Sequence, residues 1–379
     1  MDFTLTKEQR LVQKTVREFA EREVAPLAQE IDEQARFPHE TVEKMAELGL
    51  LGMMVDPKWG GGGMDTVSYT IAIEEISRAC ATTGVICSVN NSLACWPLET
   101  FGTEDQKERY LRRLATGEAL GAFALTEPGA GTDAGAQRTV AVRDGDDYVI
   151  EGSKVFISNA AAAEVFVIFA LTDPEKGSRG ISAFIVERSF PGFGVGTVED
   201  KMGIRGNGAA EIFFEDMRVP AENRLGEEGK GFKIAMATLD GGRIGIAAQA
   251  IGIAQAAFDE ALRYSTEREQ FGRPISKFQA IQWFLADMAT EIAAARHLVR
   301  KAAFTKDSGK PYSVEAAMAK LLASDVAVRV TRNAIQVHGG YGYIKDYTVE
   351  RLYRDAKITE IYEGTSEVQR MVIAGSLLR

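Results

Sequence analysis

Apolar residues recur every three or four positions over long stretches at both ends of the chain. Residues 12–20 show this spacing after residues 6–9, whose sequence is that of a helix capping box. Toward the C-terminus the same spacing covers residues 244–262, begins again at Pro274 and returns in residues 313–338. This spacing is typical of helices with one buried face, so we expect both ends of the chain to be helical.

The middle of the chain is rich in β-branched and aromatic residues instead. Residues 139–142 and 148–150 flank the turn sequence Asp144-Gly145-Asp146, and this arrangement predicts two antiparallel strands. Further apolar segments, separated by Gly and Pro, predict strands at residues 155–157, 165–169, 181–186 and 212–214. A chain of 379 residues is long enough for two or three sub-domains. We therefore predict an α+β fold with an N-terminal α-helical domain (residues 1–120), a middle antiparallel β-domain (residues 121–225) and a C-terminal four-helix-bundle domain (residues 226–379).

Composition and charge narrow the function classes. Apolar residues make up 45% and charged residues 26% of the chain, as in ordinary globular proteins. The net charge of −10 argues against binding to nucleic acid or to anionic membranes. No apolar run approaches the roughly 20 residues needed to cross a bilayer, and the N-terminus has no recognisable signal peptide. These features predict a cytoplasmic protein without membrane insertion.

Cysteines and histidines give no sign of a metal site. The three cysteines, Cys80, Cys87 and Cys95, lack the CxxC spacing of metal ligands, and we expect reduced, buried thiols. The three histidines are far apart in the sequence, and we expect His338 to pack in the core. We therefore expect no bound metal.

A carboxylate near the C-terminus is the first candidate for chemistry. Glu363 follows Ile361 and Tyr362, which can exclude water and so raise the pKa of this carboxylate toward the range of a general base. Gly364 allows a ligand to approach the backbone, and Thr365 with Ser366 can cap a helix whose N-terminus favours anionic groups. Taken alone, a Glu at a helix start is more often a surface residue that complements the helix dipole.

Three other segments could bind a ligand, although each also has a plain structural explanation. Residues 123–133 contain Gly129-Ala130-Gly131, but Pro128 and the following hairpin exclude a Rossmann turn; such a loop can still bind a pyrophosphate or a flavin through backbone N–H groups. Gly241 and Gly242 lie within a helical pattern, where each glycine lowers helix stability by about 1 kcal/mol relative to Ala. Their presence there indicates close approach by a ligand or by another helix. Residues 268–275 place a cation beside an aromatic ring, which suits a phosphate and an adenine, or simply an exposed turn.

The order and spacing of four segments carry more information than any one of them. These segments are residues 124–129 (ALTEPG), 201–205 (KMGIR), 268–272 (REQFG) and 361–365 (IYEGT). Together they resemble the acyl-CoA dehydrogenase family, most closely its short-chain (butyryl-CoA) branch, and the resemblance covers the whole chain. The fold of that family is the same α–β–α arrangement that the apolar pattern predicts on its own.

The resemblance implies FAD as the cofactor and an acyl-CoA as the substrate. The residues that match the family's FAD contacts are Phe123, Leu125, Thr126, Gly131, Thr132, Phe156, Ile157, Ser158, Arg268, Phe271, Gln279, Gln336, Val337, Gly339, Gly340, Thr365, Ser366 and Glu367. Those that match its acyl-CoA contacts are Thr132, Asp240, Gly241, Gly242, Arg243 and Gly364. In this family the adenine half of FAD is bound across a subunit interface, so the resemblance also implies a homo-oligomer, usually a tetramer.

The resemblance further implies the reaction and the role of the candidate base. Glu363 would take the α-proton of the thioester while the β-hydrogen leaves as hydride to flavin N5, near Ser158. The product would be a trans-2-enoyl-CoA, and electron-transfer flavoprotein would receive the electrons.

Three positions and three rival functions complete the prediction. Gly242 stands where the isovaleryl and long-chain branches carry another base, which favours Glu363, and Phe156 replaces a Trp that many relatives place beside the flavin. Trp96 either shortens the acyl pocket to about four carbons or packs in the core like other buried aromatics. The rival functions are a dehydrogenase for isobutyryl- or 2-methylbutyryl-CoA, an acyl-CoA oxidase, and a non-enzymatic relative that would have lost the base or the FAD loops.

Overall fold

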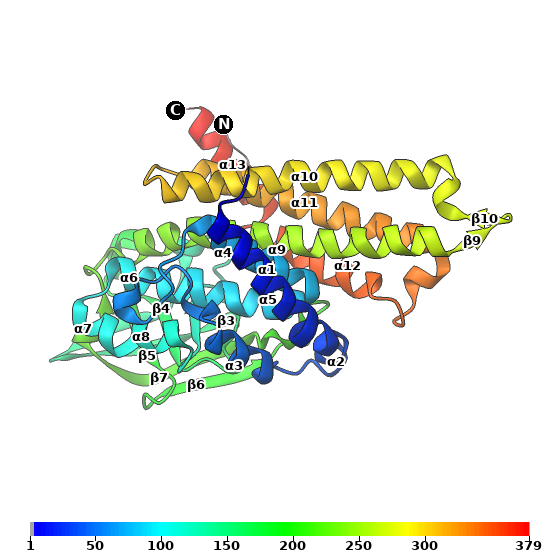
Figure 1. Cartoon of the computed structure of the whole chain (residues 1–379). Coiled ribbons are helices and arrows are strands. Elements are labelled where there is room, and N and C mark those ends of the chain that lie inside the picture. Colours follow the sequence, from blue (N-terminus) through cyan, green and yellow to red (C-terminus); the bar gives the residue numbers. More distant parts are fainter. Residues whose placement is uncertain (1–3, 379) are drawn as a thin grey trace.

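The computed structural model describes residues 4–378 and shows N-terminal helices, a middle sheet and a C-terminal bundle of long helices (Figure 1). The prediction about a signal peptide depends partly on residues 1–3, which lie outside the described residues. The N-terminal helices are α1 (Lys7–Phe19), α2 (Ala28–Gln34), α3 (His39–Glu47), α4 (Thr66–Ala79), α5 (Ala81–Ser88), α6 (Trp96–Phe101), α7 (Glu104–Gln106) and α8 (Arg112–Thr116).

Local sequence signals set the start and the first break of this helical part. α1 begins at the predicted capping box: the Gln9 N–H donates to Thr6 Oγ1, and the Thr6 N–H donates to Gln9 Oε1, both at 3.1 Å. Pro26, which lacks a backbone N–H, lies in a short 3-10 turn that follows the π-helical segment Ala20–Val24 and interrupts the α-helix there.

The middle sheet has eight strands in the order β6-β7-β3-β2-β4-β5-β8, with β1 on β4. The strands are β1 (Gly121–Ala124), β2 (Val140–Asp144), β3 (Asp147–Ile157), β4 (Val165–Leu171), β5 (Ile181–Glu187), β6 (Phe193–Val198), β7 (Ala210–Pro220) and β8 (Arg224–Leu225). Most strand pairs are antiparallel as expected. However, β1 runs parallel to β4, and β2 also makes one parallel pairing with β4. The sheet is therefore mixed. The pieces predicted at residues 148–150 and 155–157 form the single bulged strand β3.

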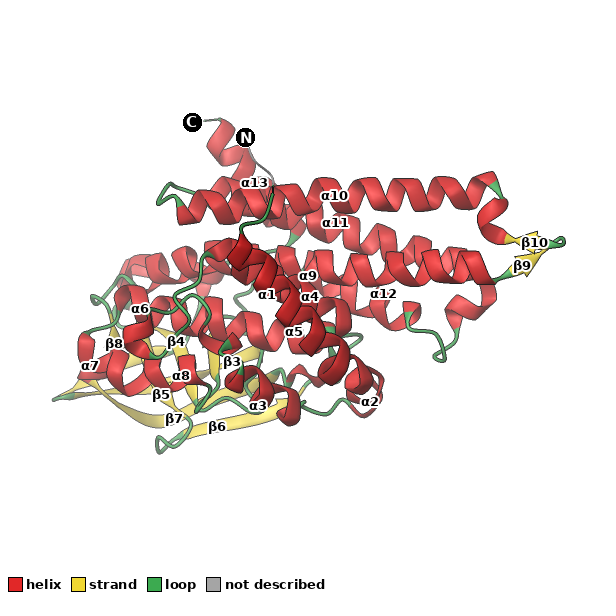
Figure 2. Cartoon of the chain, viewed as in Figure 1, coloured by secondary structure: helices red, strands yellow, loops and turns green. Residues whose placement is uncertain are grey.

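Strand β4 explains why the middle sequence is so continuously apolar. Val165, Val167 and Phe169 belong to a large core shared with the helices, whereas Phe166 and Ile168 belong to a second core on the other face of the sheet. A strand buried on both faces shows no alternation of apolar and polar residues. Figure 2 shows the sheet at the lower edge of the molecule with helices stacked over it.

The C-terminal part is built on three long helices and two shorter ones. They are α9 (Gly231–Glu267), α10 (Gln279–Asp307), α11 (Ser313–His338), α12 (Val349–Lys357) and α13 (Ser366–Leu377). α11 has the predicted bounds. The helix predicted from Pro274 begins at Gln279 instead, because the preceding residues form a hairpin of β9 (Glu269–Gln270) and β10 (Arg273–Pro274) that projects from one end of the bundle (Figure 1). Within residues 4–378, no helix is long and apolar enough to cross a membrane.

Candidate functional site

A cavity of about 400 Å³ lies between the middle sheet and the C-terminal helices. The residues of the middle domain that line it include Phe123, Leu125, Thr126, Gly131, Thr132, Phe156, Ile157 and Ser158. The residues of the two helical parts that line it, including the turn before α13, are Val89, Leu93, Phe232, Met236, Leu239, Arg243, Tyr362, Glu363, Gly364 and Val368. The cavity thus brings together predicted residues that are more than two hundred positions apart in the sequence.

Glu363 presents a desolvated carboxylate to this cavity. Its side chain is half-buried in the cavity wall, and Oε2 is shielded from water and has no hydrogen-bond partner. Burial raises the pKa of Glu363 to about 8, although Lys320 and Arg243 act in the opposite direction. The hydroxyl of the neighbouring Tyr362 donates to Gln249 Oε1, which fixes this apolar flank. A carboxylate in this state has the proton affinity of a general base near neutral pH.

The backbone around Glu363 forms a tight left-handed turn. Glu363 has φ = +52° and Gly364 has φ = +91°, a conformation that is uncommon for a residue other than Gly. Gln369 Nε2 donates to the carbonyl oxygens of Glu363 (3.3 Å) and Gly364 (2.8 Å), and Arg243 Nε reaches the Glu363 carbonyl at 3.4 Å. Thr365 caps α13 by accepting from the Val368 N–H, as predicted. Glu363 is therefore held by hydrogen bonds to its backbone and to that of Gly364 rather than by its carboxylate.

The glycines of α9 make room for this carboxylate. A Cβ added to Gly242 would lie 2.1 Å from Glu363 Oε2 and 2.8 Å from Leu93 Cδ2. At Gly241 the nearest atom would be 3.6 Å away, at Lys306 Nζ. The close approach predicted for these glycines thus occurs at Gly242, but the nearest group is the Glu363 side chain, which is neither a ligand nor another helix.

A buried ion pair supports the middle-domain wall of the cavity. Lys154 is fully buried and donates to Glu127 Oε1 (2.8 Å), while Glu127 also accepts from the N–H groups of Arg138 (2.5 Å) and Thr139 (3.0 Å). Burial lowers the pKa of Lys154 to about 8. Glu127 follows Thr126 directly, so the ion pair anchors the loop whose other residues line the cavity.

That loop leaves open space on its outer side. A Cβ at Gly131 would meet nothing within 4 Å. Phe156 lies at the cavity with φ = +60° and 66% of its surface exposed. An exposed ring beside an unobstructed glycine loop suits a planar aromatic ligand, so the residues present fit an isoalloxazine ring.

The other predicted FAD residues form two groups. Thr365, Ser366 and Glu367 lie at the start of α13, directly after Gly364. The rest lie at the other end of the bundle. Arg268 and Phe271 belong to the β9–β10 hairpin, and the Arg268 guanidinium lies 5.4 Å from the centre of the Tyr341 ring. That contact brings the hairpin beside the segment Gly339–Tyr343, which contains Gly339 and Gly340 and follows Gln336 and Val337. Gln279 is the first residue of α10. None of these side chains lines the cavity.

Three further expectations concern single residues. His338 is buried and stacks on Tyr264 with ring centres 4.2 Å apart, so its predicted packing role is confirmed. Trp96 is absent from the cavity lining and packs on Phe101 with ring centres 5.8 Å apart, which favours its packing role over a role in shortening an acyl pocket. Asp240 lies outside the cavity lining and accepts a hydrogen bond from Arg243 Nη1 at 2.6 Å.

Sequence reasoning missed the apolar part of the lining. Val89, Leu93, Met236 and Leu239 line the cavity, yet their sequence pattern is that of ordinary helix core. Lys320 of α11 was missed as well; it donates to the Gly364 carbonyl at 2.8 Å. A lysine on the buried face of a helix was the one available signal for it.

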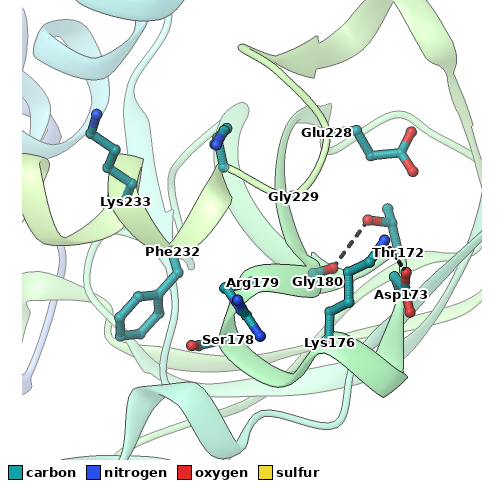
Figure 3. A pocket seen from close by; sticks show the side chains of 11 residues that line it. Thr172, Asp173, Lys176, Ser178, Arg179, Gly180, Glu228, Gly229, Phe232 and Lys233 are labelled. Carbon is teal, nitrogen blue, oxygen red and sulfur yellow. Dashed lines mark hydrogen bonds and ion pairs between the residues drawn. The ribbon is translucent and has the colours of Figure 1, made fainter.

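A second pocket of about 410 Å³ adjoins the first, because Ser178 and Phe232 line both. Four basic side chains line it, from the segment after β4 and from the start of α9: Lys176, Arg179, Lys230 and Lys233. Figure 3 shows Lys176 in its ion pair with Asp173 (2.7 Å) and Glu228 across the pocket. Glu228 also pairs with Arg224 (3.1 Å). Both carboxylates are thus partnered, and the pocket retains positive charge.

Comparison with known proteins gives one consistent result. Three family descriptions match the chain: "Acyl-CoA dehydrogenase, N-terminal domain" at residues 6–118, "middle domain" at 122–217 and "C-terminal domain" at 229–378. The short-chain specific acyl-CoA dehydrogenase of Clostridium acetobutylicum is 60% identical over 100% of both chains. The butyryl-CoA dehydrogenase structure from Megasphaera elsdenii has a TM-score of 0.99 and 52% identity over 100% of both chains. A chain solved in a study of the electron transferring flavoprotein of Acidaminococcus fermentans has a TM-score of 0.99 and 54% identity over 100% of both chains.

Proposed function

Because this chain belongs to the acyl-CoA dehydrogenase family, we propose that it oxidises short-chain acyl-CoA to trans-2-enoyl-CoA, with FAD as its cofactor. The observation that carries this proposal is the Glu363 carboxylate, which lies at a cavity with the Phe156–Ser158 wall and whose buried Oε2 has no hydrogen-bond partner among residues 4–378. This is the arrangement that a reaction at adjacent carbon atoms needs, since a base and an electron acceptor must approach the substrate from different sides.

In this function Glu363 removes the α-proton of the thioester. Desolvation makes its carboxylate a stronger base, and the left-handed turn holds it in place. Among the described residues the Glu363 N–H has no acceptor, so it is available to the enolate oxygen that forms as the proton leaves. FAD, when bound, supplies the ring that accepts two electrons and the β-hydrogen.

The apolar end of the cavity supports a short acyl chain. Val89 and Leu93 of the π-helical segment Val89–Cys95 and Met236 and Leu239 of α9 line it. A panel of butyryl-, isobutyryl-, 2-methylbutyryl- and octanoyl-CoA, scored by flavin bleaching without oxygen, tests the assignment. We expect fastest bleaching with butyryl-CoA; fastest bleaching with octanoyl-CoA would contradict a short-chain function.

The basic pocket in Figure 3 supports the proposal that the substrate is a thioester of CoA rather than a thioester without phosphate groups. CoA carries phosphate groups on its nucleotide end, and lysine and arginine bind phosphate by charge. We expect butyryl-pantetheine, which lacks those phosphates, to bind less tightly than butyryl-CoA at low salt, and the difference to shrink as salt increases. Equal KM values at low salt would contradict this part of the proposal.

Exposed residues near the β9–β10 hairpin, at the end of the bundle away from the cavity, support a homo-oligomer. A tetramer is the usual state in the family. Phe271 of the hairpin is 94% exposed, and Tyr343 of the segment Gly339–Tyr343, which meets Arg268 through Tyr341, is 87% exposed. A second copy that covers them would complete the site for the adenine half of FAD, and electron-transfer flavoprotein would then receive the electrons. Purification tests this directly: we expect a flavin absorption band that elutes with an oligomer, and a colourless monomer would contradict the function.

An acyl-CoA oxidase is the rival function, since it would use the same base and cofactor. Reoxidation of the reduced flavin separates the two. We expect slow reoxidation by air and rapid reoxidation by electron-transfer flavoprotein; fast reoxidation by oxygen would favour the oxidase.

A further inference from the structure

Lys320 is a fully buried cation next to the base turn. It lies in the middle of α11 with 0% of its surface exposed. Its ammonium group makes one hydrogen bond, 2.8 Å to the carbonyl oxygen of Gly364. Lysine is almost never fully buried without a partner of opposite charge. The question is therefore which group balances the charge of Lys320.

The surrounding charges leave Glu363 as that group. Those that act on Lys320 are Glu363, Arg243, Glu360 and Asp325. Three of them already pair elsewhere: Arg243 with Asp240 (2.6 Å), Glu360 with Lys357 (2.5 Å) and Asp325 with Arg370 (3.3 Å). Glu363 forms no ion pair within the described residues. Lys320 and Glu363 therefore balance each other across the turn without direct contact.

Each of the two groups affects the pKa of the other. Burial raises the pKa of Glu363 to about 8, and Lys320 is the largest influence that lowers it. Burial lowers the pKa of Lys320 to about 8, and Glu363 is the largest influence that raises it. Tyr69 of α4 and Tyr362 also lie near Glu363, but burial raises the pKa of both phenols, so they stay neutral.

The hydrogen bond alone does not explain a lysine at this position. Gln369 Nε2 donates to the same Gly364 oxygen, also at 2.8 Å. That carbonyl would keep a donor if Lys320 were lost. What Lys320 adds is a positive charge that favours the ionised form of the Glu363 carboxyl and so opposes the effect of burial.

We propose that Lys320 is a positioning residue for the base: it fixes the Glu363–Gly364 turn through the Gly364 carbonyl and shifts the Glu363 side chain toward its proton-accepting form. This inference rests on the proposed role of Glu363. It predicts that Lys320 acts through its charge, which distinguishes it from Gln369.

Three substitutions separate charge from hydrogen bonding. Lys320→Met removes both, Lys320→Gln keeps a donor without charge, and Lys320→Arg keeps the charge. We expect the acid limb of kcat/KM against pH to move up by about one to three pH units in the Met and Gln variants, a loss of at least about tenfold at pH 7 that recovers at high pH. The Arg variant should keep the wild-type limb. Lys357→Met, which removes a half-exposed cation near the same turn, is the matched control and should leave the limb in place.

Infrared titration of the Glu363 carboxyl, taken as wild type minus Glu363→Gln, gives a second readout that needs no turnover. We expect the carboxyl band to titrate at higher pH in Lys320→Gln than in wild type. A loss by the same factor at every pH, or an unmoved carboxyl titration in folded Lys320→Gln, would overturn the inference. Turnover by Glu363→Gln at the wild-type rate would instead overturn the proposed function, and the infrared result would still decide whether Lys320 sets the charge of Glu363.

Discussion

The two ends of the candidate cofactor site are built differently. At the Glu363 end, one chain supplies both walls of a cavity, and the groups around the base are buried and hydrogen-bonded. At the Arg268 end, the predicted adenine-binding residues lie on a projecting hairpin with Phe271 almost fully exposed. A single chain thus encloses the candidate reaction centre but leaves the predicted adenine-binding residues on an open surface.

This difference separates two kinds of defect. Changes at the Glu363 end should affect proton removal without affecting assembly, because the cavity is complete within one chain. Changes at the Arg268 end should affect assembly and cofactor retention, because that surface is open. The predictions below test this separation.

Breaking the buried ion pair under the cavity wall should have the largest effect. Lys154→Met leaves the Glu127 carboxylate buried without its cation, which typically costs about 3–5 kcal/mol of stability. Denaturant unfolding should show this loss, and adding Glu127→Gln should restore part of it. A loss below about 1 kcal/mol would mean that the wall does not depend on this pair.

Filling the space beside the base should come next. Gly242→Ala puts a Cβ 2.1 Å from Glu363 Oε2, so the carboxylate must move, and a displacement of about 1 Å can cost 10²-fold in rate. We expect kcat to fall about a hundredfold with the oligomer intact. Gly241→Ala, where the nearest atom is 3.6 Å away, is the matched control. Equal loss in both variants would point to a general helix effect.

The pH dependence should follow the desolvated base. Burial raises the pKa of Glu363 to about 8, so the carboxylate form is scarce below that value and complete above it. We expect kcat/KM to rise about tenfold per pH unit up to about pH 8 and then to level off. A profile that is flat from pH 6 to 9 would contradict a base with a raised pKa.

A substitution at the Arg268 end should have the smallest effect on the rate of the reaction itself. Phe271→Ser removes the most exposed ring of the hairpin, and we expect weaker oligomers and about tenfold weaker FAD retention, a size typical of one lost interface anchor. Turnover per bound FAD should stay near the wild-type value, as measured by rate against flavin content. A large loss per bound FAD would break the proposed separation of the two ends.

Local signals in the sequence predicted local structure well. The capping box at residues 6–9 and the bounds of α11 depend on neighbouring residues alone, and the structure has both. The parallel pairing of β1 with β4 depends on contacts more than forty positions apart, as between Gly121 and Val165, which periodicity does not report. The hairpin at residues 269–274 was missed because Pro274 also suits the first turn of a helix.

The same distinction between local signals and contacts of distant residues applies to the candidate site. Gly242 could be singled out because a glycine is costly within a helical pattern, and Glu363 because apolar residues precede it, whereas Phe156 was identified through the family resemblance. The apolar lining from Leu93 and Leu239 could not, since a residue that faces a cavity has the same pattern as one that faces the core. Lys320 could not be assigned either, because its partners lie more than forty residues away.

Proton removal by Glu363 is the central claim, and anaerobic stopped-flow with butyryl-CoA tests it most directly. Wild type and Glu363→Gln should be compared at equal FAD content, with the flavin band followed after mixing. We predict bleaching in wild type and a rate about 10²–10⁴-fold lower in the Gln variant, the range that a general base contributes. Bleaching of the Gln variant at the wild-type rate would contradict the account.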